Sequence, residues 1–183
     1  AELARRVDAV PVGDVRQLSL VYPMPPLHKR YAVKPASYVA HLLGDEGPGS
    51  LFAALKQRGW ALSLSAYLEE AQETFDLFKL DVELTPAAER NETALDAIVA
   101  AVYAYARRVS AATDERARDI HGELGALAAA AFNFSTAAKP YAYAQSLSRA
   151  VHAYAPRDVL RGASMMTEYD ADAVRAAVSA LTP

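Results

Sequence analysis

The chain has 183 residues, 52% of them hydrophobic, and its 19 Lys and Arg residues against 22 Asp and Glu residues give a formal net charge of −3. This length and apolar content suffice for one buried core, which excludes disorder as the main state, and the near-neutral balance argues against a nucleic-acid-binding module. The chain has no cysteine, which excludes a disulfide framework, a thiolate zinc finger and a cysteine nucleophile.

The first predicted element is a strand over residues 15–24. Its apolar residues alternate with the others, the period of two that is typical of a strand with one buried face. They are Leu18, Leu20, Tyr22 and Met24. Prolines at positions 23, 25 and 26 then end the strand.

Two helices are predicted next, separated by a glycine-rich break. The first begins at Pro35 and ends before Gly44-Asp45-Glu46-Gly47-Pro48-Gly49, since apolar residues recur at helical spacing up to Leu43. Ser50 is the predicted N-cap of the second helix, because its hydroxyl can accept a hydrogen bond from a free amide of the first turn. Gly59 supplies the left-handed end of that helix.

An antiparallel hairpin follows, made of two strands joined by a polar link at residues 69–73. The first strand is predicted to turn one set of side chains toward the core: Leu62, Leu64, Ala66 and Leu68. The second strand, residues 77–84, contributes another set: Phe78, Leu80, Val82 and Leu84. At least three strands are therefore expected.

The second half is alanine-rich, and apolar stripes at spacings of three and four predict four helices there. The stripes cover residues 95–109, 120–134, 139–154 and 170–181, with Thr113 and Asp170 as capping residues. The middle two stripes include Ile120, Leu124, Leu127, Ala131, Phe134, Tyr143, Leu147, Val151 and Tyr154. Strands first and helices afterwards indicate an α+β fold, with helices on one face of a mostly antiparallel sheet.

Neither a membrane span nor a signal peptide is expected. The longest apolar stretches, residues 97–106 and 125–132, are shorter than the about 18 residues that a span needs. The chain opens Ala-Glu-Leu-Ala-Arg-Arg, with charges where a signal peptide has its apolar core and without an initiator methionine. We therefore expect an excised piece of a longer protein, all the more because such a sheet normally takes another strand after the last helix.

The histidines do not form a recognisable metal site. A catalytic zinc site takes two histidines on one helical face plus a carboxylate, as in His-Glu-x-x-His or His-x-x-Glu-His, and neither string occurs. We expect surface or hydrogen-bonded histidines, and no metal in this chain. The four are His28, His41, His121 and His152.

Motifs for other chemistry are missing as well. Ser50 is the only serine in a glycine context, and capping explains it better than a Gly-x-Ser-x-Gly nucleophile turn. Residues 44–50 lack the Lys-Ser/Thr ending of a phosphate loop. The acids at residues 45–46 and 69–73 are interpreted as solvated charges. The residues themselves thus predict an α+β domain without catalytic residues.

Three runs of residues carry a more specific signal. They are His41-Leu42-Leu43-Gly44-Asp45-Glu46-Gly47-Pro48-Gly49-Ser50-Leu51, Leu55-Lys56-Gln57-Arg58-Gly59-Trp60 and Leu64-Ser65-Ala66. These runs closely resemble the second of four homologous domains in the insulin-degrading enzyme and pitrilysin family (M16) of zinc metallopeptidases. The similarity extends to residues 15–26, 34–35, 132–134 and 139–141, so it covers essentially the whole chain.

The resemblance implies a LuxS/metallopeptidase-like M16 fold, with residues 1–183 as a single domain that lacks its last strand. In this family the zinc motif and the general-base glutamate belong to the first domain, and the second closes part of a chamber around the peptide. The implied parent is therefore a zinc metalloendopeptidase, whereas this piece holds no metal, cofactor or catalytic residue and is inert alone. Its implied partners are peptide substrates and the other domains of the same chain, not nucleic acid or a membrane.

The resemblance also implies a substrate-binding site, distant from the zinc, that holds the amino terminus of the peptide. By position it comprises His41, Gly44, Glu46, Leu64, Ser65 and Ala66. Glu46 is the implied acceptor of the amino terminus, because an α-amino group with a pKa of about 7.7–8.0 is largely cationic at neutral pH. Leu64 to Ala66 form the implied docking strand, whose backbone hydrogen bonds are indifferent to side-chain identity.

Two residues depart from the family pattern. Asp45 stands where a histidine is common, and its negative charge beside Glu46 either favours basic amino termini or makes the Glu46 carboxyl group harder to ionise. Ala66 stands where a glycine is usual, and its methyl group can crowd an incoming backbone.

Two other functions stay open. Relatives in mitochondrial processing peptidase and in respiratory-complex core proteins keep the fold but can lack zinc, which leaves a structural or processing-complex subunit as the first alternative. A free-standing peptide-binding module is the second. A His-x-x-Glu-His string upstream in the parent reading frame would favour the peptidase, whereas its absence would favour the subunit.

Overall fold

The computed structural model describes residues 5–136 and 138–181. Within them, three strands form one antiparallel sheet in the order β1-β3-β2: β1 Gln17–Met24, β2 Ala61–Ala71 and β3 Asp76–Leu84. The α-helices are α1 Pro35–Leu43, α2 Leu51–Gln57, α3 Pro86–Glu89, α4 Glu92–Ser110, α5 Asp114–Asn133, α6 Pro140–Ala153 and α7 Ala171–Ser179. Short 3-10 helices are η1 Leu27–Lys29, η2 Pro156–Asp158 and η3 Gly162–Ser164. None of the helices described has the length and apolar content that crossing a membrane requires.

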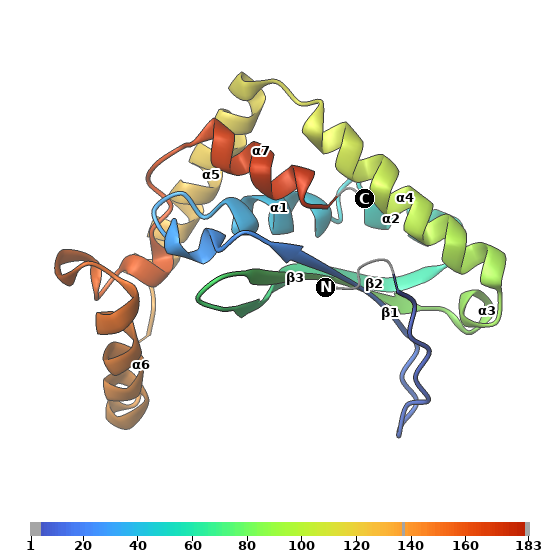
Figure 1. Ribbon diagram of the computed structural model, residues 1–183, viewed down its shortest axis with the longest axis horizontal. Helices are drawn as coiled ribbons and strands as arrows, with labels where there is room; N and C mark the ends of the chain where they lie inside the picture. The colour runs from blue at the N-terminus through green and yellow to red at the C-terminus, as the bar shows by residue number, and fades with distance from the viewer. Residues whose placement is uncertain (1–4, 137, 182–183) are drawn as a thin grey trace.

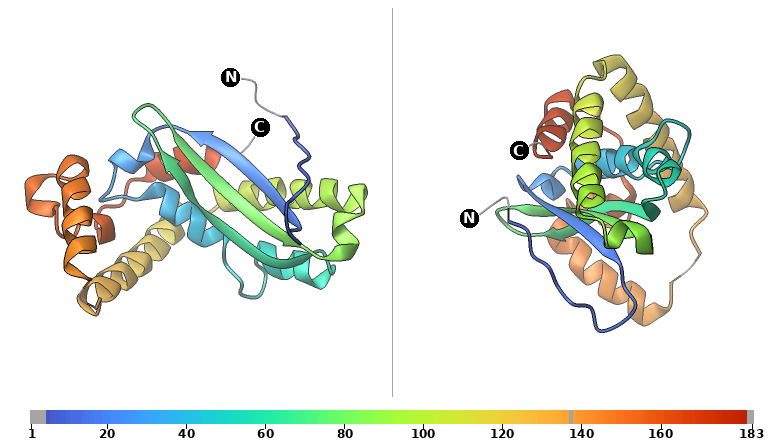
Figure 2. Two further views of the ribbon diagram at one scale, coloured as in Figure 1. Left: turned by 90° about the horizontal axis from the view of Figure 1, so that it is seen from below. Right: turned by 90° about the vertical axis from the view of Figure 1, so that its right-hand side faces the viewer.

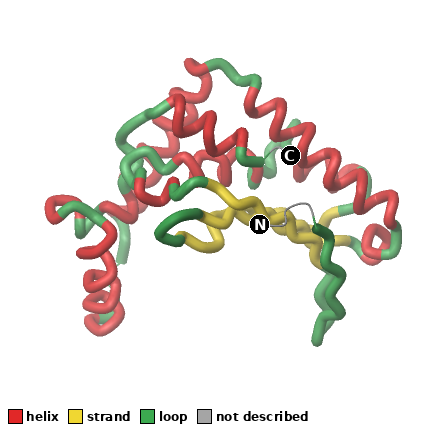
Figure 3. The backbone as a smooth tube through the Cα atoms, viewed as in Figure 1, coloured by secondary structure: helices red, strands yellow, loops and turns green. Residues whose placement is uncertain are grey.

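The sheet has one covered and one open face, as predicted for this α+β fold. Helices α1, α2, α4, α5 and α7 lie on one side of the strands in Figure 1, and Figure 3 shows the same layering. Seen from below, the strands lie in front of the helices (Figure 2, left). On the covered face, Phe78, Leu80 and Val82 of β3 are 0% exposed, which confirms the predicted alternation of residues 77–84.

The hairpin of β2 and β3 is confirmed, but its turn is shorter than predicted. β2 continues to Ala71, which pairs with Asp76, and the amide of Gln72 donates to the carbonyl of Phe75 at 2.8 Å. The predicted link at residues 69–73 is therefore wrong in part. Polar side chains are no obstacle to a strand whose one face is open to solvent.

Leu62 does not face the core as predicted. It is 54% exposed, whereas Ala61 and Leu64 are buried. The strand register shifts between Ala61 and Ser63, which marks a β-bulge, and a bulge changes the face to which the following side chains point. Ala61 therefore takes the core position that the simple alternation gave to Leu62.

The helix ends follow the predicted signals. Ser50, Thr113 and Asp170 each accept a hydrogen bond from a first-turn amide, in α2 at 3.1 Å, in α5 at 3.3 Å and in α7 at 3.0 Å. Gly59, just after α2, has a φ of +70°, a conformation that glycine adopts without strain. These local rules place the break between α1 and α2 at residues 44–50.

One hydrophobic cluster joins the sheet to α1, α4 and α7. Its buried residues run from Tyr22 on β1 to Leu181 just after α7. The predicted stripe of α4 is confirmed at Ile98 and Val102, and α7 contributes Val178. The core therefore links the first strand to the last helix of the described chain.

The last part of α5, after Leu124, and all of α6 lie outside this cluster. α5 is buried at Ala117 and His121, and α6 has no buried residue. Figure 1 shows α6 turned away from the sheet. The predicted stripe of α5 packs against the core at Ile120 and Leu124, whereas Leu127, Phe134 and Val151 are 64%, 88% and 55% exposed. Periodicity predicts a face suited to packing, but it does not say where the partner lies.

The loop before α1 ties the first part of the chain to the last. The carbonyl of Ala32 accepts the amides of Thr167 at 2.8 Å and Glu168 at 3.0 Å. The carbonyl of Val33 accepts the Nε2–H of His121 at 2.7 Å, and that imidazole is buried. These bonds hold α5 and the segment before α7 against the start of α1.

Gly125 lets α5 pass close to that segment. A Cβ atom at Gly125 would collide with the backbone oxygen of Met166, whereas at Gly122 it would meet nothing within 4 Å. We expect Gly125→Ala to lower the free energy of unfolding by about 1–3 kcal/mol through overpacking, and Gly122→Ala to raise it by up to about 1 kcal/mol. Urea unfolding followed by circular dichroism measures both, and equal stability of the two variants would contradict the close approach.

Candidate functional site

The six residues singled out in the sequence lie together in one groove. The groove is open to solvent, has a volume of about 470 Å³ and lies between the end of α1 and β2. It is lined by Ala40, His41, Gly44, Asp45, Glu46, Leu64, Ser65 and Ala66. The structure thus brings all six predicted residues together, while their role in binding stays a prediction.

The end of α1 forms one wall of the groove. Gly44 follows the last helical residue, and its amide donates to the carbonyl of Ala40 at 2.8 Å. A Cβ atom at Gly44 would lie 3.0 Å from that carbonyl oxygen and 3.9 Å from the amide nitrogen of Ala66 on β2. A side chain here would therefore crowd the carbonyl of Ala40 at the helix end, whereas its distance to the strand would be an ordinary van der Waals contact. Ala40 was not singled out in the sequence, although its spacing of four from Gly44 puts both on one helix face.

The other wall is the edge strand of the sheet. β2 pairs with β3 alone, so one side of its backbone has no neighbouring strand among the residues that the structure describes. The unpaired amides and carbonyls of such an edge can accept an added strand. Leu64 packs its side chain into the core, whereas Ser65 is exposed and Ala66 is half-buried.

Carboxylates give the groove its polarity. Asp45, Glu46 and His41 are exposed, and the lining contains no lysine or arginine. Oδ1 of Asp45 accepts the amide of Gly47 at 3.2 Å, which holds the side chain over the turn. The pKa of Tyr105 on α4 is raised by burial and by the nearby charge of Asp45. The groove can therefore attract a cationic group such as an ammonium.

A carboxylate also anchors the open face of the sheet. Asp81 on β3 accepts hydrogen bonds from Ser19 at 2.6 Å and Tyr67 at 2.7 Å, and the Nζ of Lys79 lies 3.5 Å from it. Burial alone would raise the pKa of Asp81, but hydrogen bonds from Ser19, Tyr67 and Gln17 and the charge of Lys79 outweigh it, so the pKa is lowered. This carboxylate is therefore ionised at neutral pH.

The other histidines make structural contacts or are exposed. Nδ1 of His28 lies 2.5 Å from Oδ1 of Asp76, a fully buried residue, and His121 donates to Val33. His152 is exposed on α6. The residues in the described ranges bring together no group of three or more His, Asp or Glu side chains that could hold a metal ion. They therefore do not fit a zinc site.

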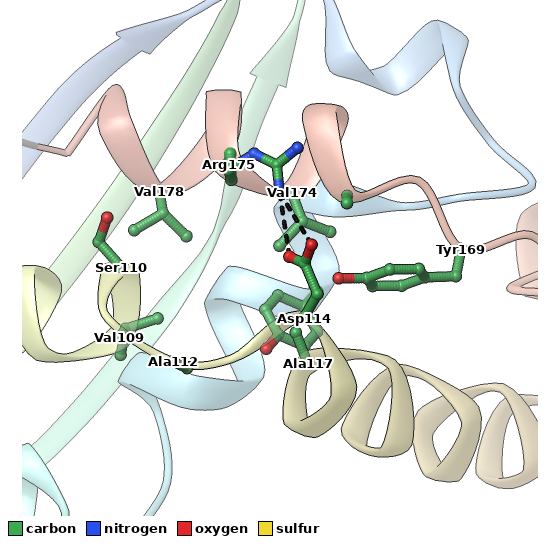
Figure 4. A pocket seen from close by; sticks show the side chains of 11 residues that line it. Val109, Ser110, Ala112, Asp114, Ala117, Tyr169, Val174, Arg175 and Val178 are labelled. Carbon is green, nitrogen blue, oxygen red and sulfur yellow. Dashed lines mark hydrogen bonds and ion pairs between the residues drawn. The ribbon is translucent and has the colours of Figure 1, made fainter.

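A second cavity lies among α4, α5 and α7 and is too small for a peptide. Its volume of about 30 Å³ has room for about one water molecule. Figure 4 shows Arg175 of α7 and Asp114 of α5 joined beside it, with N–O distances of 3.0 and 3.3 Å, and Tyr169 pointing toward this pair. This cavity belongs to the packing of α7.

Two known families match the chain. The family described as the peptidase M16 inactive domain matches residues 2–120, and the family described as the middle or third domain of peptidase M16 matches residues 132–183. The first match alone covers more than half of the chain. It contains the whole groove, while α6 and α7 lie in the second match.

Individual relatives are similar over nearly the whole chain. Insulin-degrading enzyme-like 1, peroxisomal, of Arabidopsis thaliana is 29% identical over 177 residues, which are 97% of this chain and 18% of the relative. Insulin-degrading enzyme of Homo sapiens is 30% identical over 174 residues, 95% of this chain and 17% of the relative. The crystal structure of pitrilysin has a similar fold, with a TM-score of 0.82 at 19% identity over 92% of this chain and 18% of that chain. The chain thus spans less than a fifth of the length of each of these proteins.

Proposed function

Because the chain belongs to the M16 peptidase family, we propose that it is the non-catalytic second domain of a zinc metalloendopeptidase. In this proposal, residues 1–183 act as one domain that anchors the amino terminus of a peptide and helps to enclose the chamber where the peptide is cut. The zinc is bound by another domain of the same chain. Peptide substrates and those other domains are the partners.

The free edge of β2 beside the carboxylate of Glu46 carries this proposal. An α-ammonium group at Glu46 would gain a charge-assisted hydrogen bond. The next residues of the peptide could then pair with the backbone of Leu64 to Ala66 as an added strand. Such a site recognises a free amino terminus and an extended backbone. It does not recognise the side chains at the bond that is cut.

Anchoring at a distance can assist cleavage without any catalytic residue in this chain. A peptide held by its amino terminus has its remaining length confined near the catalytic domain, which raises its effective concentration there if the spacing fits. One core links β1 to α7, which supports a single domain over the described residues.

Binding of a short peptide to the chain tests the anchoring. The probe is a peptide with a free amino terminus and a fluorophore at its carboxyl end. It is expected to bind about tenfold more tightly than its acetylated form, because acetylation removes the positive charge that interacts with Glu46. Fluorescence anisotropy measures both affinities. Incubation with added Zn²⁺ is expected to leave the peptide uncut, as mass spectrometry would show. Equal affinities, or cleavage by this chain, would contradict the proposal.

A further inference from the structure

The negative charge of the groove exceeds what one amino terminus can neutralise. Asp45 and Glu46 are consecutive exposed carboxylates, and the lining offers no lysine or arginine to pair with them. The α-ammonium of a peptide carries a single positive charge. Its docking at Glu46 leaves Asp45 without a cation in the lining, where His41 is the one other titratable group.

The charge of Asp45 has a fixed place. Its carboxylate accepts the amide of Gly47 at 3.2 Å, and a Cβ atom at Gly47 would lie 3.4 Å from both carboxylate oxygens. The side chain therefore folds back over the turn instead of extending freely into solvent. Its charge also helps to raise the pKa of Tyr105 on α4. A docked peptide would meet this charge close to its first residues.

The open face of the sheet adds negative charge on the other side of a docked strand. Side chains of an added strand alternate between the two faces of a sheet. On the open face, the β2–β3 hairpin carries Asp81 and Glu83 against Lys79, and the charge of Glu69 acts on Lys79 as well. Lys79 already lies 3.5 Å from Asp81, and its pKa is raised because the charges of Asp81 and Glu69 outweigh its burial. An acidic peptide would thus meet like charge on both faces.

We propose that the groove selects peptides with a lysine or arginine among their first residues, and that Asp45 is the residue responsible for this selection. The inference rests on the proposed function, since it names the substrate class of the same groove. Lysine and arginine side chains are long enough to reach a neighbouring carboxylate while the backbone pairs with β2. The selection concerns the end that is anchored, not the bond that is cut.

Three peptides that differ only at their second residue test this inference. All have free amino termini and neutral residues elsewhere, and the second residue is Arg, Gln or Glu. Anisotropy is expected to rank their affinities in that order, with roughly two- to fivefold steps. The steps should shrink in about 1 M salt, where the Debye length falls from about 10 Å to about 3 Å.

Asp45→Asn is expected to reduce the Arg-to-Glu affinity ratio by about twofold or more. Asp119→Asn is the matched control, because Asp119 is an exposed acid of α5 outside the groove lining, and it should leave the ratio unchanged. Equal affinities for the three free peptides, together with weaker binding of an acetylated peptide, would overturn this inference and leave the anchoring intact. Equal binding of free and acetylated peptides would overturn both.

Discussion

Replacing Glu46 by glutamine is expected to weaken the binding of a peptide with a free amino terminus about tenfold. Glutamine keeps the shape and an acceptor oxygen but loses the charge, so the effect isolates the attraction between the carboxylate and the α-ammonium. We place the loss near tenfold, at the lower end for a hydrogen bond to a charged group, because Glu46 is exposed and solvent screens the interaction. Fluorescence anisotropy with the free and the acetylated peptide gives the two affinities for each variant.

The acetylated peptide is the internal control for this substitution. It has no charged terminus, so its affinity should change little when Glu46 becomes glutamine. Glu123→Gln is the control for net charge, since Glu123 is an exposed acid of α5 that lies outside the groove lining. Should Glu46→Gln weaken both peptides equally, the carboxylate would act on the fold or on the backbone, and the anchoring at Glu46 would be wrong.

The six groove residues were implied by the resemblance to the family, whereas local rules predicted the ends of the elements that carry them. The helix end at Gly44, the cap at Ser50 and the turn at Gly59 follow from residue type, and each was confirmed. Local rules could not place β2 at the sheet edge, beside the end of α1. That arrangement depends on strand order, which periodicity does not encode.

Other parts of the structure left no readable signal in the sequence. The bulge that exposes Leu62 requires knowledge of the partner strand, because alternation alone predicts an unbroken face. The predicted stripe of α5 packs against the core at Ile120 and Leu124, yet Leu127 on the same stripe and Val151 on α6 are exposed. An amphipathic pattern identifies a surface that can pack, whereas burial depends on what the rest of the fold brings to it.

Asp76 was not predicted either, because an acid at the start of a strand usually faces solvent. It is instead 0% exposed, and both of its oxygens are used: Oδ2 accepts the amide of His28 at 2.8 Å, and Oδ1 lies 2.5 Å from Nδ1 of the same residue. The contact spans 48 positions of the chain and joins η1 to the beginning of β3. A buried carboxylate needs such partners to be stable in the fold, and His28 supplies them here.

Replacing Asp76 by alanine is therefore expected to lower the free energy of unfolding by about 3 kcal/mol, near the lower end for a broken buried pair, because the side chain of His28 is 29% exposed. Asp76→Asn should recover most of this loss, since its amide oxygen can accept the His28 amide and its NH₂ can donate to a neutral Nδ1. Asp96→Ala, at an exposed acid of α4, should stay within about 0.5 kcal/mol of the unsubstituted chain. Urea unfolding at neutral pH gives all three values. If Asp76→Ala were as stable as Asp96→Ala, the pair with His28 would make no net contribution, and η1 would be held to the sheet by Leu27 and its apolar neighbours instead.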